Sequence, residues 1–228
     1  TMTTTITAIG TEGFEVLAGG KRLLIDAFYH PALWVGSAPR LRARNFHQAD
    51  LILVTHAHAD HFFPEEVLDV ARRTGACVVA PAAAIHVLAP HLPPAALVPL
   101  EPPEAPEPRP AEMRPAEVRG VPITAFRTFH ARGHNSYLVE LPGFRFFHDG
   151  DNENTRRIDT AALGALDALF IGPWQGSGWV NFVEALQPAK WLLMHLTLEE
   201  LEQHRAGKFL PDLCDHIPLP DRLLALAP

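Results

Sequence analysis

The chain has 228 residues, of which 47% are hydrophobic, 20% charged and 8% aromatic. These values are those of an ordinary globular protein that can bury a sizeable core. Nineteen Lys and Arg against 26 Asp and Glu leave a formal charge of −7, which argues against non-specific binding to nucleic acid. Two cysteines exclude a disulfide framework and a four-cysteine zinc site, and the 13 histidines are the feature that stands out.

The sequence shows no membrane or export signal. No stretch reaches the roughly 18 consecutive apolar residues that a membrane helix needs. Residues 1–5, Thr-Met-Thr-Thr-Thr, have neither the basic start nor the apolar core of a secretory signal. We therefore expect a cytoplasmic protein, with one domain over residues 1–228, because single domains of up to roughly 250 residues are common.

The first half predicts a meander of strands followed by alternating strands and helices. Short apolar or β-branched runs bounded by Gly, Pro or Asp are typical of strands. The predicted strands are 3–9, 13–18, 22–27, 51–55 and 77–80. A helix is predicted over 64–74, because Pro64 suits a first helical position and Gly75 ends the apolar stripe, and a second helix over 81–88.

The segment of about residues 90–120 has a different composition. Residues 99–115 alone hold seven prolines and four glutamates. Because Pro fits neither a helix interior nor a central strand, we expect an extended surface connection in polyproline-like geometry. A linker between two domains is the alternative, and it is disfavoured because neither side looks self-sufficient.

The second half repeats the order of strands followed by an alternating pattern. The predicted strands are 121–128, 136–141, 144–148, 167–171 and 191–194. The predicted helices are 155–163, 179–186 and 197–205. Such alternation predicts the α/β class.

A cluster of potential metal ligands follows the predicted strand 51–55. His56, His58, Asp60 and His61 lie within six residues, in a loop where small Ala spacers leave room for the side chains to converge. Neutral imidazoles and carboxylates are suitable ligands for zinc, iron or manganese. The loop therefore predicts a metal site.

This His-x-His-x-Asp-His string resembles the metallo-β-lactamase-fold hydrolases. The similarity extends to Gly150-Asp151 at the end of a predicted strand, to His195 after the apolar run 191–194, and to an opening hairpin over 19–26. The resemblance implies a four-layer αββα sandwich with a dinuclear metal site at one edge.

The resemblance also implies a role for each ligand. His56 and His58 would hold the first metal ion, Asp60, His61 and His195 the second, and Asp151 would bridge the two. The implied cofactors are two divalent ions, zinc first, with manganese or iron as alternatives. A hydroxide between them would be the nucleophile, with Asp60 and Asp151 as the catalytic carboxylates.

The third histidine of the first site has two candidates. His130 ends a predicted strand, 21 residues before Asp151, and is the preferred one. His134 stays open, because Gly133-His134 resembles the corresponding motif of some relatives.

Other residues are candidates for supporting roles. Asp26 is a candidate partner for a metal-bound histidine, because such histidines donate their free N–H to a carboxylate or carbonyl. His148 and Asp149 flank Asp151, with simple packing the favoured interpretation for His148. The glycine-rich segment 174–179 is best interpreted as a tight turn, and candidates for an anionic group are Arg127, Arg132, Arg156 and Arg157.

Within the family, the chain looks most similar to the L-ascorbate-6-phosphate lactonase-like branch. The similarity lies in the length, the strand 135–140 and the ending Phe-His-Asp-Gly-Asp at 147–151. It implies hydrolysis of a small-molecule ester, lactone or phosphoester. The alternatives are a phosphodiesterase or nuclease activity, a non-catalytic metal-binding sensor, and redox chemistry on two irons.

Overall fold

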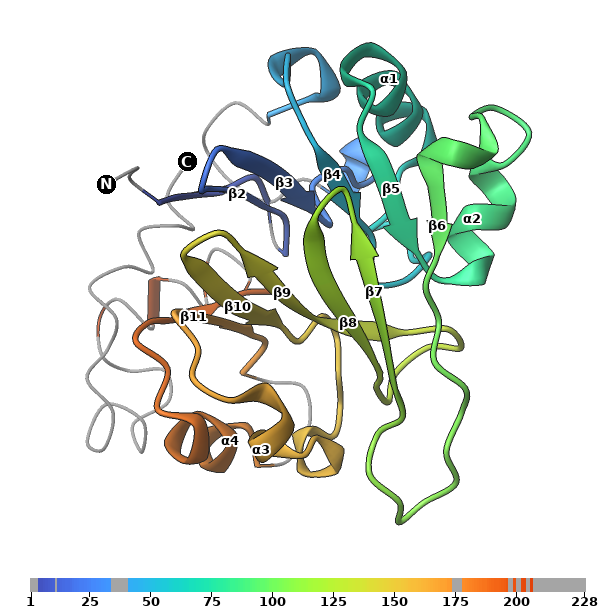
Figure 1. Ribbon diagram of the computed structural model, residues 1–228. Helices are drawn as coiled ribbons and strands as arrows, with labels where there is room; N and C mark the ends of the chain where they lie inside the picture. The colour runs from blue at the N-terminus through green and yellow to red at the C-terminus, as the bar shows by residue number, and fades with distance from the viewer. Residues whose placement is uncertain are drawn as a thin grey trace.

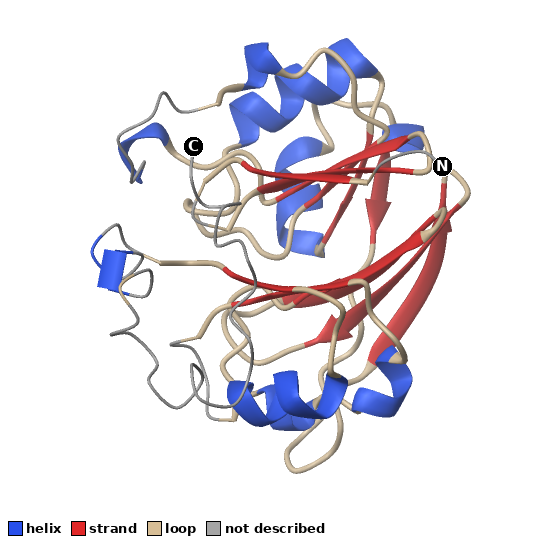
Figure 2. Cartoon of the chain, turned by 90° about the vertical axis from the view of Figure 1, so that its left-hand side faces the viewer, coloured by secondary structure: helices blue, strands red, loops and turns tan. Residues whose placement is uncertain are grey.

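Two six-stranded β-sheets pack face to face, and helices cover their outer faces (Figures 1 and 2). The computed structural model describes residues 4–10, 12–33, 41–173 and 178–196 and the single residues 199, 202, 203 and 206. The predicted αββα sandwich is confirmed. Most of the predicted helix 197–205 and most of the turn 174–179 lie outside the described residues.

The first sheet begins as an antiparallel meander and continues as parallel strands. Its strands, in spatial order, are β1 (Thr5–Ala8), β2 (Phe14–Ala18), β3 (Lys21–Ile25), β4 (Leu51–Leu53), β5 (Cys77–Ala80) and β6 (Leu97–Pro99). Gly19 and Gly20 both have positive φ, as the two-residue β2–β3 hairpin turn requires. The outer face carries the helices α1 (Pro64–Thr74) and α2 (Ala82–Leu88). Three short 3-10 helices, Pro31–Leu33, Ala43–Asn45 and Pro94–Ala96, lie in the connections between strands.

The second sheet repeats this organisation in the second half of the chain. Its spatial order is β12 (Trp191–Leu193), β11 (Ala168–Ile171), β10 (Phe144–His148), β9 (Asn135–Leu141), β8 (Val121–Arg127) and β7 (Met113–Val118). The strands β10, β11 and β12 are parallel, and the others are antiparallel to their neighbours. Its outer face carries a 3-10 helix, Thr155–Arg157, and the helices α3 (Thr160–Leu163) and α4 (Trp179–Leu186).

Three apolar clusters hold the four layers together. The largest lies between the sheets and includes Phe14 and Val16 of β2, Phe146 of β10 and Phe170 of β11. A second cluster joins the first sheet to α1 and α2, and a third joins the second sheet to α3 and α4. The strands next to the helices are therefore buried on both faces, which explains their continuous apolar runs.

Two segments differ from the sequence prediction: one contains strands that were not predicted, and the other contains an interrupted helix. The proline-rich stretch contributes β6 and β7, and these are the edge strands of the two sheets, where a missing N–H is tolerated. The predicted helix 155–163 is interrupted: Ile158 is extended, and the Asp159 carboxylate accepts a hydrogen bond from Ala161 N to start α3 afresh. Among the described residues, no helix is long and apolar enough to span a membrane.

Replacing Phe170 with Ala is expected to destabilise the protein. Its ring packs 4.5 Å from the Phe14 ring and 5.5 Å from the Phe146 ring, centroid to centroid, and so joins the two sheets. Truncating a fully buried Phe costs about 3–5 kcal/mol through lost burial and the cavity left behind. Chemical denaturation will measure the loss, and the exposed Phe129→Ala, at 50% exposure, is the control with little expected effect.

Candidate metal site

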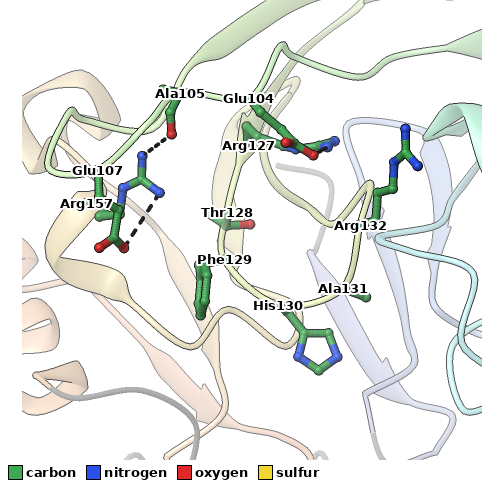
Figure 3. A pocket seen from close by; sticks show the side chains of 10 residues that line it. All are labelled: Glu104, Ala105, Glu107, Arg127, Thr128, Phe129, His130, Ala131, Arg132 and Arg157. Carbon is green, nitrogen blue, oxygen red and sulfur yellow. Dashed lines mark hydrogen bonds and ion pairs between the residues drawn. The ribbon is translucent and has the colours of Figure 1, made fainter.

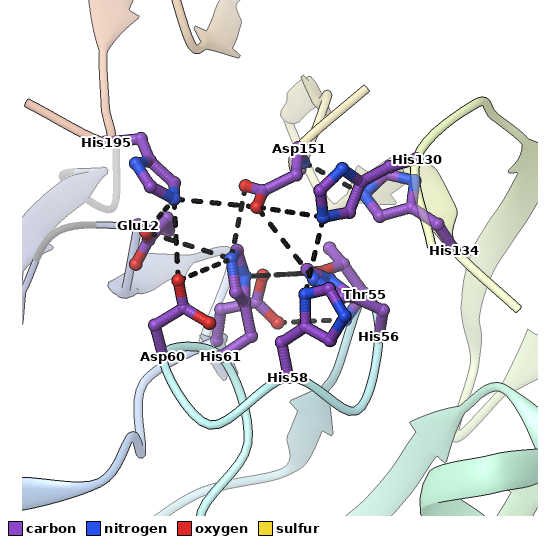
Figure 4. Close-up of polar contacts among 12 residues, drawn as sticks. Glu12, Thr55, His56, His58, Asp60, His61, His130, His134, Asp151 and His195 are labelled. Atoms are coloured by element: carbon purple, nitrogen blue, oxygen red, sulfur yellow. Dashed lines mark hydrogen bonds and ion pairs between the residues drawn. The ribbon is translucent and has the colours of Figure 1, made fainter. Parts of the chain in front are cut away.

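The predicted site residues lie in loops that follow the carboxyl ends of strands. His56, His58, Asp60 and His61 follow β4, while His130 follows β8, Asp151 follows β10 and His195 follows β12. The first four come from the first sheet and the last three from the second, and Figure 4 shows their side chains converging on one region. The two sheets thus present their ligand-bearing loops at the same edge.

Asp26 fixes the histidine-rich loop. It follows β3 with a φ of 44°, a left-handed conformation that Asp tolerates. Its carboxylate accepts hydrogen bonds from Thr55 N (2.8 Å) and Thr55 Oγ1 (2.6 Å), and its Oδ2 lies 2.8 Å from His61 Nδ1. The His61 Nδ1–H therefore donates to Asp26, and Nε2 faces the site. This is the supporting role that the sequence predicts for Asp26.

Three imidazoles form a first group: His56, His58 and His130. Their ligand atoms lie within 4.8 Å of one another, and His130 Nε2 is 3.4 Å from His58 Nδ1. The Nδ1 of His130 lies 2.7 Å from Glu153 Oε1, so this carboxylate holds the Nδ1–H and turns Nε2 toward the group. Sequence reasoning missed Glu153, whose place depends on the loop after Asp151.

His134 lies outside this group and has a different role. Its Nε2 accepts a hydrogen bond from Asp151 N (2.9 Å), and its Nδ1 lies 2.7 Å from Thr128 Oγ1. A Cβ at Gly150 would lie 2.6 Å from His134 Nε2, so only glycine fits there. Of the two candidates for the third histidine, the structure brings His130 to the group and uses His134 to hold the Gly150–Asp151 turn.

A second group contains two imidazoles and two carboxylates: Glu12, His61, Asp151 and His195. His61 Nε2 lies 3.1 Å from Asp151 Oδ1, and His195 Nε2 lies 2.7 Å from Glu12 Oε1 and 3.5 Å from Asp151 Oδ2. His195 has a φ of 62°, which is uncommon outside glycine and recurs at functional sites.

Asp60 lies beside the second group and is not one of its four members. Its Oδ2 is 3.6 Å from His195 Nε2 and 4.0 Å from His61 Nε2. About a third of the side chain is exposed. Asp60 thus borders the group on its solvent side.

Glu12 was not among the predicted residues. It precedes β2, and β2 runs antiparallel to β3, with Phe14 paired to Ile25. The hairpin therefore carries Glu12 to the same edge as Asp26. The predicted hairpin, followed two residues beyond its last pair, is the signal that could have found it.

The two groups differ in their electrostatics. Burial, helped by the neighbouring His61, lowers the pKa of His56 to about 2, so its imidazole is neutral and able to bind a metal. Burial opposes protonation of His195, but Asp151, Asp60 and Glu12 together raise its pKa to about 11. The contact with His195 lowers the pKa of Asp60 to about 2. The second group therefore concentrates carboxylate charge that attracts cations.

The chemistry of the two groups fits metal ions. Among the described residues, several buried polar atoms of the groups have no hydrogen-bond partner: Glu12 Oε2, His56 Nε2, His61 Nε2 and Asp151 Oδ1. Leaving such an atom unsatisfied costs about 1–3 kcal/mol. Bonds of about 2.1 Å to one ion separate neighbouring ligand atoms by about 3.0–3.4 Å. Separations of 2.7–3.7 Å between ligand atoms of the same group are close to these values.

A pocket of about 330 Å³ borders the first group and shares His130 with it (Figure 3). Three of the four arginines singled out in the sequence line it: Arg127, Arg132 and Arg157. Arg127 forms ion pairs with Glu101 and Glu104, at 2.8 and 2.7 Å. The pocket wall therefore carries both signs of charge. The fourth, Arg156, lies instead against Gly178.

His148 and Asp149 support the site from behind. The His148 ring is fully buried against Phe14 and Phe170, as the packing interpretation predicts. Its Nε2–H also donates to Glu12 O (3.1 Å), and its Nδ1 accepts from Gly150 N (3.2 Å). Burial raises the pKa of Asp149 to about 7, and this side chain bonds to Ser136 and Asn152.

Comparison with known proteins places the chain in a family. A "Beta-lactamase superfamily domain" model matches residues 21–203. A "UPF0173 metal-dependent hydrolase" of Nitratidesulfovibrio vulgaris (strain DP4) is 32% identical over 95% of this chain and 90% of its own length.

Solved structures share the fold. Igni18, described as a novel metallo hydrolase from Ignicoccus hospitalis, aligns with a TM-score of 0.62 and 18% identity over 91% of this chain and 93% of that chain. CmlA, a diiron beta-hydroxylase from Streptomyces venezuelae, aligns with a TM-score of 0.62 and 14% identity over 86% of this chain and 45% of that chain. At these identities the likeness concerns the fold alone. With the family model spanning most of the chain, the protein belongs to the beta-lactamase superfamily and, within it, to the UPF0173 metal-dependent hydrolases.

Proposed function

We propose that the protein is a hydrolase that holds two divalent metal ions and cleaves a small ester, lactone or phosphoester. One observation supports this most strongly: Asp151, a member of the second group, also approaches the first. Its Oδ1 is 3.1 Å from His61 Nε2, and its Oδ2 is 3.5 Å from both His130 Nε2 and His195 Nε2. A carboxylate in this position would be within reach of both ions.

The proposal assigns each ligand to one ion. His56, His58 and His130 would hold one ion, and Asp60, His61 and His195 the other, with Asp151 shared. Bound divalent ions supply a water whose pKa falls to about 7 and polarise a carbonyl or phosphoryl oxygen. Asp60, at the solvent side of the second group, is placed to accept a hydrogen bond from that water.

The substrate is proposed to be a small molecule. The pocket beside His130 has the volume of a small-ligand site, and its arginines could meet a carboxylate or phosphate group. The lactonase-like resemblance favours an ester or lactone, with zinc as the first choice of metal and manganese or iron as alternatives. The pocket wall carries both signs of charge and so does not select between an ester and a phosphodiester. A phosphodiester is therefore kept as the second choice of substrate.

The test combines metal analysis with a substrate panel. Elemental analysis of the purified, unchelated protein is expected to find about two metal equivalents per chain. Rates are then measured with a δ-lactone, a p-nitrophenyl ester and bis(p-nitrophenyl) phosphate, for the wild type and for His58→Ala. We expect ester or lactone turnover that chelation and His58→Ala both abolish. Full activity in either case would contradict the proposal, and faster turnover of the diester would favour the second choice.

A further inference from the structure

Glu12 is a carboxylate without exposure to solvent. Its side chain is 1% exposed, although a buried carboxylate loses its hydration at a cost of several kcal/mol. Oε1 lies 2.7 Å from His195 Nε2 and 3.7 Å from His61 Nε2, and within the described part of the chain Oε2 has no hydrogen-bond partner. Both imidazole nitrogens also face Asp151. Glu12 thus points at the centre that the other ligands surround (Figure 4).

The backbone holds Glu12 in this position. The His148 Nε2–H donates to Glu12 O, and the next residue, Gly13, accepts from Ile9 N at 2.7 Å. A Cβ at Gly13 would lie 2.7 Å from Asp26 O, so glycine is needed for the chain to pass this close to the end of β3. Contacts to three separate segments therefore fix a residue that lies outside any strand. Such support is expected for a side chain that must be oriented.

The donor atoms of the two groups differ in kind. The first group offers three nitrogens and shares the Asp151 carboxylate. With Glu12, the second group offers two nitrogens and the carboxylates of Glu12, Asp60 and Asp151. Imidazole suits zinc, whereas carboxylate-rich sites with more than four ligands suit manganese, and two histidines with carboxylate suit ferrous iron.

We propose that Glu12 is a ligand of the second metal ion and that it shifts this site's preference from Zn²⁺ toward Mn²⁺ or Fe²⁺. The inference rests on the two-metal site proposed above. Removing the third carboxylate would leave a donor set closer to that of the first group. The two ions would then be bound by sites of similar preference.

The experiment is a Mn²⁺ titration of metal-free protein preloaded with one equivalent of Zn²⁺, followed by the electron paramagnetic resonance signal of free Mn²⁺. The wild type is expected to bind one further Mn²⁺ per chain. Glu12→Gln, which keeps the size of the side chain, is expected to weaken Mn²⁺ binding at least about tenfold while retaining the Zn²⁺. Glu15→Gln is the matched control, because Glu15 pairs with Arg22 on the opposite face of β2 and should leave Mn²⁺ binding unchanged.

The outcomes separate this inference from the proposed function. A wild type that binds only one ion of any kind overturns the two-metal site itself. If the wild type binds both ions and Glu12→Gln keeps the same Mn²⁺ affinity, the role of Glu12 as a ligand is overturned while the two-metal site stands. The contact between Glu12 and His195 is then an ion pair. If Glu12→Gln fails to fold by circular dichroism, Glu12→Asp replaces it, and a weakened Mn²⁺ affinity is again expected because the shortened carboxylate withdraws from the centre.

Discussion

Asp151→Asn is expected to abolish hydrolysis and to lower the metal content below two equivalents per chain. The Asp151 carboxylate is the side chain that approaches both groups, and an amide has one weaker oxygen donor in place of two charged ones. Metal ions contribute several kcal/mol of transition-state stabilisation, so their loss predicts a rate at least about 10³-fold lower. Elemental analysis and initial rates on the same preparation measure both effects.

Asp149→Asn is the matched control for this variant. Asp149 lies two residues earlier on the same turn, and its Oδ1 accepts from Asn152 Nδ2 and Ser136 Oγ. An Asn oxygen can keep both contacts, so the variant should retain its metal. Normal metal content and rate in Asp151→Asn would contradict the placement of Asp151 between two ions.

Asp26→Asn is expected to weaken metal binding without touching a ligand. In the wild type, His61 Nδ1 donates to Asp26 Oδ2, so that Nε2 is the nitrogen that can bind a metal. An Asn side chain can accept from Thr55 N through its oxygen, but its NH₂ group then donates to His61 Nδ1. The imidazole proton moves to Nε2, the nitrogen that faces the second group. Loss of such an orienting partner costs about 10–100-fold in metal affinity.

Calorimetric titration of the metal-free variant with Zn²⁺ or Mn²⁺ will measure this loss. Asp50→Asn serves as the control, because Asp50 also joins β3 to its neighbours, accepting from Arg22 N at 2.8 Å, but at the opposite end of the strands. It should bind metal like the wild type. Wild-type affinity in Asp26→Asn would mean that Asp26 supports the loop alone and not the tautomer of His61.

The sequence predicts the part of the site that local patterns encode. His56, His58, Asp60 and His61 lie on one loop after one strand, so their spacing alone indicates a common centre. Asp151 and His195 could be placed through the family's ordered motifs, and each follows a strand of the second sheet.

The missing parts depend on tertiary pairing. Glu12 reaches the site because β2 and β3 pair with a particular register, and Glu153 because its loop turns back toward His130. Glu153 has no spacing that marks it in the chain, and Glu12 is marked only through the register of the hairpin. The choice between His130 and His134 also depends on a hydrogen bond that the sequence does not reveal. His134 Nε2 already accepts a hydrogen bond from Asp151 N.

Because the candidate ligands are divided between the two sheets, metal binding is linked to the free energy with which the sheets pack together. His56, His58 and His61 move with the first sheet, and His130, Asp151 and His195 with the second, so each group is assembled from both. Neither half can offer a complete coordination sphere before the halves have docked. A metal ion bound by ligands from both sheets would therefore stabilise the folded state, adding about 4 kcal/mol to the free energy of unfolding when its free concentration is about 1,000 times the dissociation constant.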